Sequence, residues 1–184
     1  NSGRMNLGVV TVNLPRIALE SEGDMNKFWE IFNERMNIAE DALVYRVERT
    51  KEATPANAPI LYQYGAFGRR LGKEESVDQL FKNRRATISL GYIGLYEVAT
   101  VFFGNHWENN PEAKEFTLDI IRDMKRRVEE WSDQYGYHFS IYSTPSESLT
   151  DRFCRLDTEK FGSIPDITDK EYYTNSFHYD VRKN

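Results

Sequence analysis

The chain has 184 residues and a formal net charge of −5, from 24 Lys and Arg against 29 Asp and Glu. Its 40% hydrophobic and 29% charged residues are typical of a globular domain and exclude a disordered chain. No apolar run approaches the roughly 18–20 residues of a membrane-spanning helix, and the acidic balance argues against a surface that coats nucleic acid. The single cysteine, Cys154, excludes a disulfide framework and a Cys-rich zinc site, and it fits a reducing, cytoplasmic setting.

The first half of the chain predicts a strand, a long helix and a loop region. Residues 7–14 form a β-branched run that Pro15 ends. After a predicted N-cap at Asp24, apolar residues recur every three or four positions, which predicts one face of an amphipathic helix ending at Thr54-Pro55. These apolar residues are Phe28, Phe32, Met36, Ala39, Leu43 and Val47. Several prolines and glycines in residues 55–72 predict a loop region.

The middle of the chain predicts a strand followed by two helices. Residues 86–90 are expected to form the strand, and Gly91 and Gly94 lead into an apolar helix. That helix is expected to carry Ile93, Leu95, Val98, Val101 and Phe102. Asn110-Pro111 predicts the start of a long helix, because a capping side chain precedes a proline in the first turn. Gly136 predicts the end of that helix.

The last part of the chain completes an α/β pattern. Residues 137–142 and 172–179 predict two strands, with a helix from about Ser146 to Leu156 between them. Strands that alternate with helices predict a mainly parallel sheet with helical crossovers. Four strands are too few to close a barrel, so the sheet is either open or part of a larger barrel.

Hydroxyl side chains are concentrated between the third predicted strand and the helix that follows it. They are Ser143, Thr144, Ser146 and Ser148, interspersed with Pro145 and Glu147. A helix N-terminus at this place offers free N–H groups and a dipole that favour an anion, so residues 143–148 could hold a phosphate. The same residues could simply cap the helix, which is the commoner use of such a pattern. Spacing alone leaves both interpretations open.

Other polar residues are weaker candidates. Asn6, Asn175 and Ser176 lie at strand starts or ends and could hydrogen-bond a ligand, although turn chemistry explains such residues equally simply. The three histidines have no metal-ligand spacing, so no metal site is predicted. Cys154 has no Cys or His beside it in the sequence, which favours a structural thiol.

Four segments of the chain carry a family resemblance. They are NSGRMNLGVVTVNL (1–14), SLGYIGLYE (89–97), STPSESLT (143–150) and ITDKEYYTNSFHYDV (167–181). In this order they are similar to segments of the large chain of anaerobic, class III ribonucleoside-triphosphate reductases. The resemblance covers essentially the whole sequence, which therefore looks like an internal fragment of a longer catalytic chain.

The resemblance implies a fold and a chemistry. Residues 1–184 are then part of a ten-stranded α/β barrel of the glycyl-radical enzyme and ribonucleotide reductase type. The family converts ribonucleoside triphosphates to 2′-deoxyribonucleotides, the precursors of DNA, by glycyl and thiyl radical chemistry, often with formate as reductant. It implies a homodimer, nucleotide effectors and a radical-SAM activating enzyme as partners. The radical cysteine is expected before Asn1, and the glycyl radical and a zinc motif after Asn184, so this chain alone is expected to be inactive.

The resemblance also assigns roles to residues. Asn6 matches an asparagine close to the reactive cysteine, which implies a catalytic contact with the ribose hydroxyls or formate. Residues 143–148 match the loop that holds the substrate phosphates, and Asn175 and Ser176 match a strand that lines the barrel. Cys154 does not match the radical cysteine. Two alternatives stay open: a glycyl-radical enzyme for a small non-nucleotide substrate, and a non-catalytic α/β domain that binds phosphate.

Overall fold

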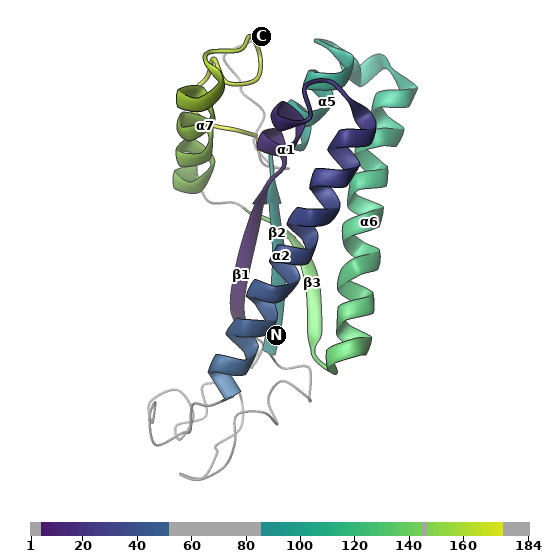
Figure 1. Cartoon of the computed structure of the whole chain (residues 1–184), viewed down its shortest axis with the longest axis vertical. Coiled ribbons are helices and arrows are strands. Elements are labelled where there is room, and N and C mark those ends of the chain that lie inside the picture. The colour runs from purple at the N-terminus through teal and green to yellow at the C-terminus, as the bar shows by residue number, and fades with distance from the viewer. Residues whose placement is uncertain (1–4, 52–85, 145–146, 175–184) are drawn as a thin grey trace. The chain divides into compact units, whose positions relative to one another are not determined.

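The computed structural model of the chain describes residues 5–51, 86–144 and 147–174 (Figure 1). Within these residues a parallel sheet has three strands in the order β1-β2-β3. The strands are β1 (Met5–Asn13), β2 (Ala86–Ile93) and β3 (His138–Ser143). The predicted α/β fold with a parallel sheet is therefore confirmed. None of the described helices is both long and apolar enough to cross a membrane.

Helices connect and follow the strands. They are α1 (Leu14–Glu20), α2 (Met25–Lys51), α5 (Leu95–Phe103), the short 3₁₀ helix η1 (Trp107–Asn109), α6 (Pro111–Tyr135) and α7 (Glu147–Phe161). The predicted start of α2 is confirmed, because Asp24 Oδ1 accepts hydrogen bonds of 2.9 and 3.2 Å from the N–H groups of Asn26 and Lys27. All six predicted apolar positions of α2 are buried. Its predicted end at Thr54-Pro55 and the predicted loop 55–72 lie outside the described residues.

The predicted bounds of α6 are also confirmed. At its start, Asn110 Oδ1 accepts a 2.9 Å hydrogen bond from the N–H of Glu112. At its end, Gly136 has a φ of 73°, the left-handed conformation that glycine adopts without strain. Between these two residues, Ile120, Met124 and Trp131 are buried and keep the helical period.

The strand predicted over 7–14 is confirmed as β1, but an unpredicted helix follows it, and the second strand ends later than predicted. Pro15 does not simply end a strand but lies in the first turn of α1, where its missing N–H needs no partner. Asn13 caps this helix by accepting a 3.2 Å hydrogen bond from the N–H of Arg16. Strand β2 continues through Gly91 to Ile93, so Ile93 belongs to the strand, and the turn comes at Gly94 with a φ of 75°.

Two predictions near the C-terminal end also change. Helix α7 continues past Leu156 to Phe161. The strand predicted over 172–179 is not formed at residues 172–174. There the Tyr173 hydroxyl bonds to Asp157, and the Thr174 N–H and carbonyl bond to Glu97 and to the Gly94 N–H beside β2. The rest of that predicted strand, residues 175–179, lies outside the described residues.

The chain divides into two compact units, each with its own core. The first comprises residues 1–10, 38–90 and 125–141, and the second comprises residues 11–37, 91–124 and 142–184. In the first unit, Leu43 of α2, Ile88 of β2 and Trp131 of α6 are among the buried residues. The second unit contains the carboxyl ends of all three strands, where ligands bind in parallel α/β proteins.

Candidate functional site

The carboxyl ends of the three strands are joined by hydrogen bonds in the second unit. The N–H of Thr144, one residue beyond β3, donates to the carbonyl of Tyr92 in β2 at 3.3 Å. The hydroxyl groups of Thr144 and Thr11 in β1 share a hydrogen bond of 3.1 Å. Thr144 therefore connects the exit of β3 to both other strands.

The segment predicted to bind phosphate begins at this junction. The side chain of Thr144 is 6% exposed, so its hydroxyl is used inside the protein. Ser143 forms a hydrogen bond with Tyr92, which partly opposes the effect of burial in raising the pKa of the Tyr92 hydroxyl. Helix α7 starts at Glu147, four residues after β3 ends at Ser143, so its N-terminal N–H groups follow the end of β3 within one short segment of the chain.

The other predicted site residues are described in part or not at all. Asn6 lies on β1 in the first unit, where only its backbone is described. Glu147 and Ser148 begin α7, and nothing is described of their side chains. Pro145, Ser146, Asn175 and Ser176 lie outside the described residues. The functional roles of these residues stay predictions.

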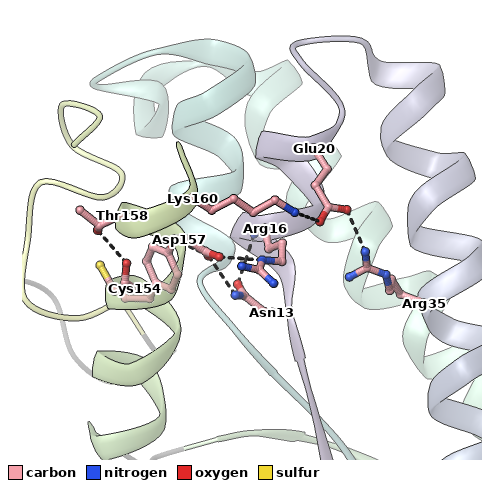
Figure 2. A network of polar contacts seen from close by, with 9 residues as sticks. Asn13, Arg16, Glu20, Arg35, Cys154, Asp157, Thr158 and Lys160 are labelled. Atoms are coloured by element: carbon pink, nitrogen blue, oxygen red, sulfur yellow. Dashed lines mark hydrogen bonds and ion pairs between the residues drawn. The ribbon is translucent and has the colours of Figure 1, made fainter. Parts of the chain in front are cut away.

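Asp157 of α7 is a buried carboxylate that binds Asn13 at the end of β1 and Arg16 in α1 (Figure 2). It also binds Tyr173. Its Oδ2 accepts hydrogen bonds from Asn13 Nδ2 at 2.9 Å and from the Tyr173 hydroxyl at 2.7 Å. Its Oδ1 accepts a 2.8 Å charged hydrogen bond from Arg16 Nε. The Asp157 side chain is 0% exposed and that of Arg16 is 29% exposed. A buried carboxylate with these partners is compensated and fixed in one orientation.

A second buried carboxylate, Glu97 of α5, holds Thr174. Glu97 Oε1 accepts a 2.9 Å hydrogen bond from the Thr174 N–H, and Oε2 accepts a 2.8 Å hydrogen bond from the Thr174 hydroxyl. Lys170 Nζ lies 2.5 Å from Glu97 Oε1, and the two side chains are 9% and 0% exposed. The N–H of Gly94 donates to the Thr174 carbonyl at 2.8 Å. Thr174 is therefore bound at its N–H, its carbonyl and its side chain.

Cys154 lies on α7, and the charges of both carboxylates, Glu97 and Asp157, act on its thiol. Its side chain is fully buried, and its thiol donates a 3.2 Å hydrogen bond to the Lys170 carbonyl. Burial, and then the negative charge of Glu97, raise the pKa of the thiol to about 11. A protonated, enclosed thiol agrees with the structural role expected from the sequence. Among the described residues, no three His, Cys, Asp or Glu side chains are grouped so that they could share a metal ion.

Neither carboxylate cluster was predicted from the sequence. Glu97 had a visible signal, because it stands alone as a charged residue in the apolar helix LYEVATVFF. Asn13 had a signal too, since Asn-Leu-Pro resembles the Asn-Pro start recognised at α6. Asp157 had none, because it lies among other charged residues on an amphipathic helix.

Comparison with known proteins gives a consistent result over the whole chain. Residues 1–184 match the family described as anaerobic ribonucleoside-triphosphate reductase. The chain is 50% identical over 184 residues to the protein of that name from Salmonella typhimurium, and 47% identical over 186 residues to that of Enterobacteria phage T4. It covers 26% and 29% of the length of these two relatives, so it spans about a quarter of proteins of this kind.

Solved structures agree with the sequence comparison. The anaerobic ribonucleotide reductase of Thermotoga maritima with citrate in the active site matches with a TM-score of 0.73 and 26% identity. That match covers 97% of this chain and 33% of the other. The same Thermotoga maritima reductase in complex with dATP and CTP matches with a TM-score of 0.70 and 26% identity, over 94% of this chain and 28% of the other.

Proposed function

The chain belongs to the anaerobic ribonucleoside-triphosphate reductase family, and from this premise we propose that it forms part of the catalytic domain of such a reductase. In this proposal residues 1–184 supply a portion of a ten-stranded α/β barrel within a longer chain. That longer chain reduces ribonucleoside triphosphates to 2′-deoxyribonucleotides.

The strongest support for this proposal is a sequence identity to a reductase that extends over the whole chain. A relative of known name is 50% identical over 100% of this chain, which includes each strand and the turn after it. In parallel α/β proteins the turns after the strands carry the ligand-binding residues, so the resemblance extends to the part where function is located. The dATP and CTP in one of the related structures support nucleotides as ligands of this family.

The substrate phosphates are proposed to bind at residues 143–148. Two features support this assignment: α7 begins at Glu147, four residues after the end of β3, and the N-terminal N–H groups and dipole of a helix favour a phosphate. Thr144 is proposed to hold the loop to the sheet rather than to contact phosphate, because its buried hydroxyl is bonded to Thr11. The hydroxyls of Ser146 and Ser148 are the candidates for direct contact, whereas the Ser143 side chain is bonded to Tyr92 and is proposed to help hold the loop.

Asn6 is proposed to contact the ribose hydroxyls or formate, and Asn175 and Ser176 to line the barrel. Membership of the family implies a glycyl radical. Its chemistry, passed to a cysteine, is the removal of a hydrogen atom from the ribose. Cys154 does not fit that cysteine, because its thiol is fully buried and donates to the Lys170 carbonyl. The proposal therefore places the radical residues, and a zinc motif, elsewhere in the longer chain. We further propose that the longer chain forms a homodimer, is activated by a radical-SAM enzyme and uses formate as reductant.

The test is anaerobic turnover by the full-length protein with its activating enzyme, formate and a ribonucleoside triphosphate. We expect 2′-deoxyribonucleotide to form, and we expect Asn6→Ala to abolish its formation while the glycyl radical still forms. Replacing both Ser146 and Ser148 by Ala is expected to raise the nucleotide KM. Thr50→Ala is a control, since the Thr50 hydroxyl donates to the Arg46 carbonyl on an exposed helix surface. A radical-bearing enzyme that forms no deoxyribonucleotide would contradict the proposal.

A further inference from the structure

We propose that Glu97 and Asp157 are positioning residues that fix Tyr173 and Thr174, the last two described residues of the chain. The inference rests on the proposed function, in which the next residues along the chain, Asn175 and Ser176, are proposed to line the barrel. Two buried carboxylates from α5 and α7 hold the two consecutive residues before this pair, and so set the position from which the chain continues toward it.

The contacts of Thr174 are specific to threonine or serine. Glu97 accepts from both its N–H and its hydroxyl, at 2.9 and 2.8 Å, and the Gly94 N–H donates to its carbonyl at 2.8 Å. Such a set fixes the backbone direction and the side-chain rotamer together, because each oxygen of one carboxylate receives a different donor of the same residue. A shift of the segment by one residue would put Tyr173 or Asn175 in place of Thr174, and Oε2 of the buried carboxylate would lose the hydroxyl donor that fits it.

Tyr173 is fixed by a separate set of contacts. Its hydroxyl donates to Asp157 Oδ2 at 2.7 Å, and its N–H donates to the Thr150 carbonyl at 3.4 Å. Its ring is 1% exposed and packs in a cluster with Ile93 and Cys154. The ring therefore anchors the segment at the end of β2, and the hydroxyl anchors it to α7.

Stability alone explains these carboxylates poorly. Glu97 is paired with Lys170, whose Nζ also lies 5.6 Å from the centre of the Tyr96 ring, and Asp157 is paired with Arg16. Removing charges from water costs much of what such pairs return, so apolar side chains of similar volume are often as stabilising. Buried pairs instead impose one geometry, because any other arrangement leaves a charge uncompensated. That requirement fits a segment that must present the following residues in one register.

The test uses the activated full-length enzyme and a pair of matched substitutions. Thr174→Val keeps the shape of the side chain and removes the donor to Glu97, and Thr174→Ser keeps the donor. Thr100→Val is the control. Thr100 lies on α5 and is 6% exposed, like Thr174, but its hydroxyl donates to the Tyr96 carbonyl and not to a carboxylate. The readouts are kcat per glycyl radical, the nucleotide KM, the thermal midpoint, and hydrogen exchange of the peptide that contains residues 173–176.

We expect Thr174→Val to lower kcat by about tenfold to a hundredfold, since a small misplacement at a reacting centre has effects of this size. Its hydrogen exchange is expected to accelerate at residues 173–176, and Thr174→Ser is expected to restore both properties. Thr100→Val removes a hydroxyl at an equally buried position but leaves no carboxylate without a donor, so it is expected to lower the thermal midpoint less and to keep the wild-type kcat.

Two results would overturn the inference. If the wild type is active and Thr174→Val keeps its kcat, or loses it only as much as Thr100→Val does, the carboxylate contacts are structural and the inference fails alone. If the radical-bearing wild type forms no deoxyribonucleotide, the proposed function fails and takes the inference with it. The wild-type assay therefore separates the two failures.

Discussion

The second unit contains two buried regions of opposite character. One is a cluster of aromatic rings, in which Phe28 lies 5.4–5.9 Å from the ring centres of Trp29, Phe32, Phe102 and Phe116. The other is the pair of carboxylates, Glu97 and Asp157, whose partners are bound at distances of 2.5–2.9 Å. Both regions are buried at their centres, but apolar burial stabilises the first, and charged hydrogen bonds hold the second.

The difference separates stability from geometry. Burial of apolar area is nearly non-directional, and the edge-to-face preference of ring pairs adds only about 0.5–1.5 kcal/mol, so the cluster stabilises α2, α5 and α6 with weaker demands on geometry. Hydrogen bonds to a carboxylate are directional, and an unsatisfied buried charge is costly, so the second region accepts one arrangement only. We conclude that the aromatic cluster holds the unit together and that the carboxylates determine where its chain segments lie.

The largest effect is expected at Gly94, where the carboxylate region has no room for a side chain. A Cβ at Gly94 would lie 2.1 Å from Cγ and 2.5 Å from Cδ of Pro15, and its φ is 75°. Gly94→Ala is therefore expected to prevent native folding of this unit, measured as loss of the cooperative thermal transition. Gly136→Ala is the control at the end of α6, with a φ of 73° and nothing within 4 Å of a built Cβ, and it is expected to cost only about 1–2 kcal/mol. Equal effects would contradict the role of the Pro15 contact.

The next effect is expected in the aromatic cluster. Phe28 is fully buried, and Phe28→Ala is expected to lower the free energy of unfolding by about 3–5 kcal/mol through lost burial and a cavity. Phe28→Leu is expected to lower it less. If the cluster supplies stability only, either variant keeps the wild-type kcat at temperatures where it is folded. A kcat loss in fully folded Phe28→Leu would break the distinction between the two regions.

Asp157→Asn is expected to have a smaller effect on stability. The amide cannot pair with the charge of Arg16, and its NH₂ group would face another donor, so a loss of about 1.5–3 kcal/mol is expected in denaturation experiments. The exposed pair of Arg126 and Glu130, 2.9 Å apart on α6, is the control. Glu130→Gln is expected to cost at most about 0.5 kcal/mol. A similar loss in both variants would show that burial does not strengthen the contacts of Asp157.

The smallest effect is expected in alkaline solution. The Cys154 thiol has a pKa of about 11 in the folded chain against an ordinary value of 9.0, because burial disfavours the thiolate. The folded state then holds a proton that the unfolded state releases, so this contribution to stability is complete below pH 9 and is lost as the pH rises toward 11. The measurement is the thermal midpoint from pH 8 to 11 for the wild type and for Cys154→Ala. The wild type is expected to lose more over this range, and parallel curves would contradict the assignment.

The two regions also differ in how far the sequence predicted them. The apolar face of α2, from Phe28 to Val47, was predicted because helical spacing repeats locally along the chain. The bounds of α6 were predicted from Asn110-Pro111 and Gly136, whose backbone preferences are also local. The same local logic applied to Asn13 and Pro15 would have predicted α1, but the preceding β-branched run favoured a simple strand end.

The carboxylate contacts could not be predicted in the same way. Glu97 binds Thr174 across 77 positions, and Asn13 binds Asp157 across 144 positions, so no local pattern relates the partners. Among the candidate site residues, local reasoning placed 143–148 at the junction of β3 and α7, where the described backbone has it. The roles of Asn6, Asn175 and Ser176 came from the family resemblance alone.

The most direct test of the account is a structure of the full-length protein with a ribonucleoside triphosphate bound. We predict phosphate oxygens within about 3 Å of the N–H groups at the start of α7, with Thr144 still bonded to Thr11. A triphosphate bound elsewhere, with residues 143–148 serving only as a helix cap, would contradict the proposed site.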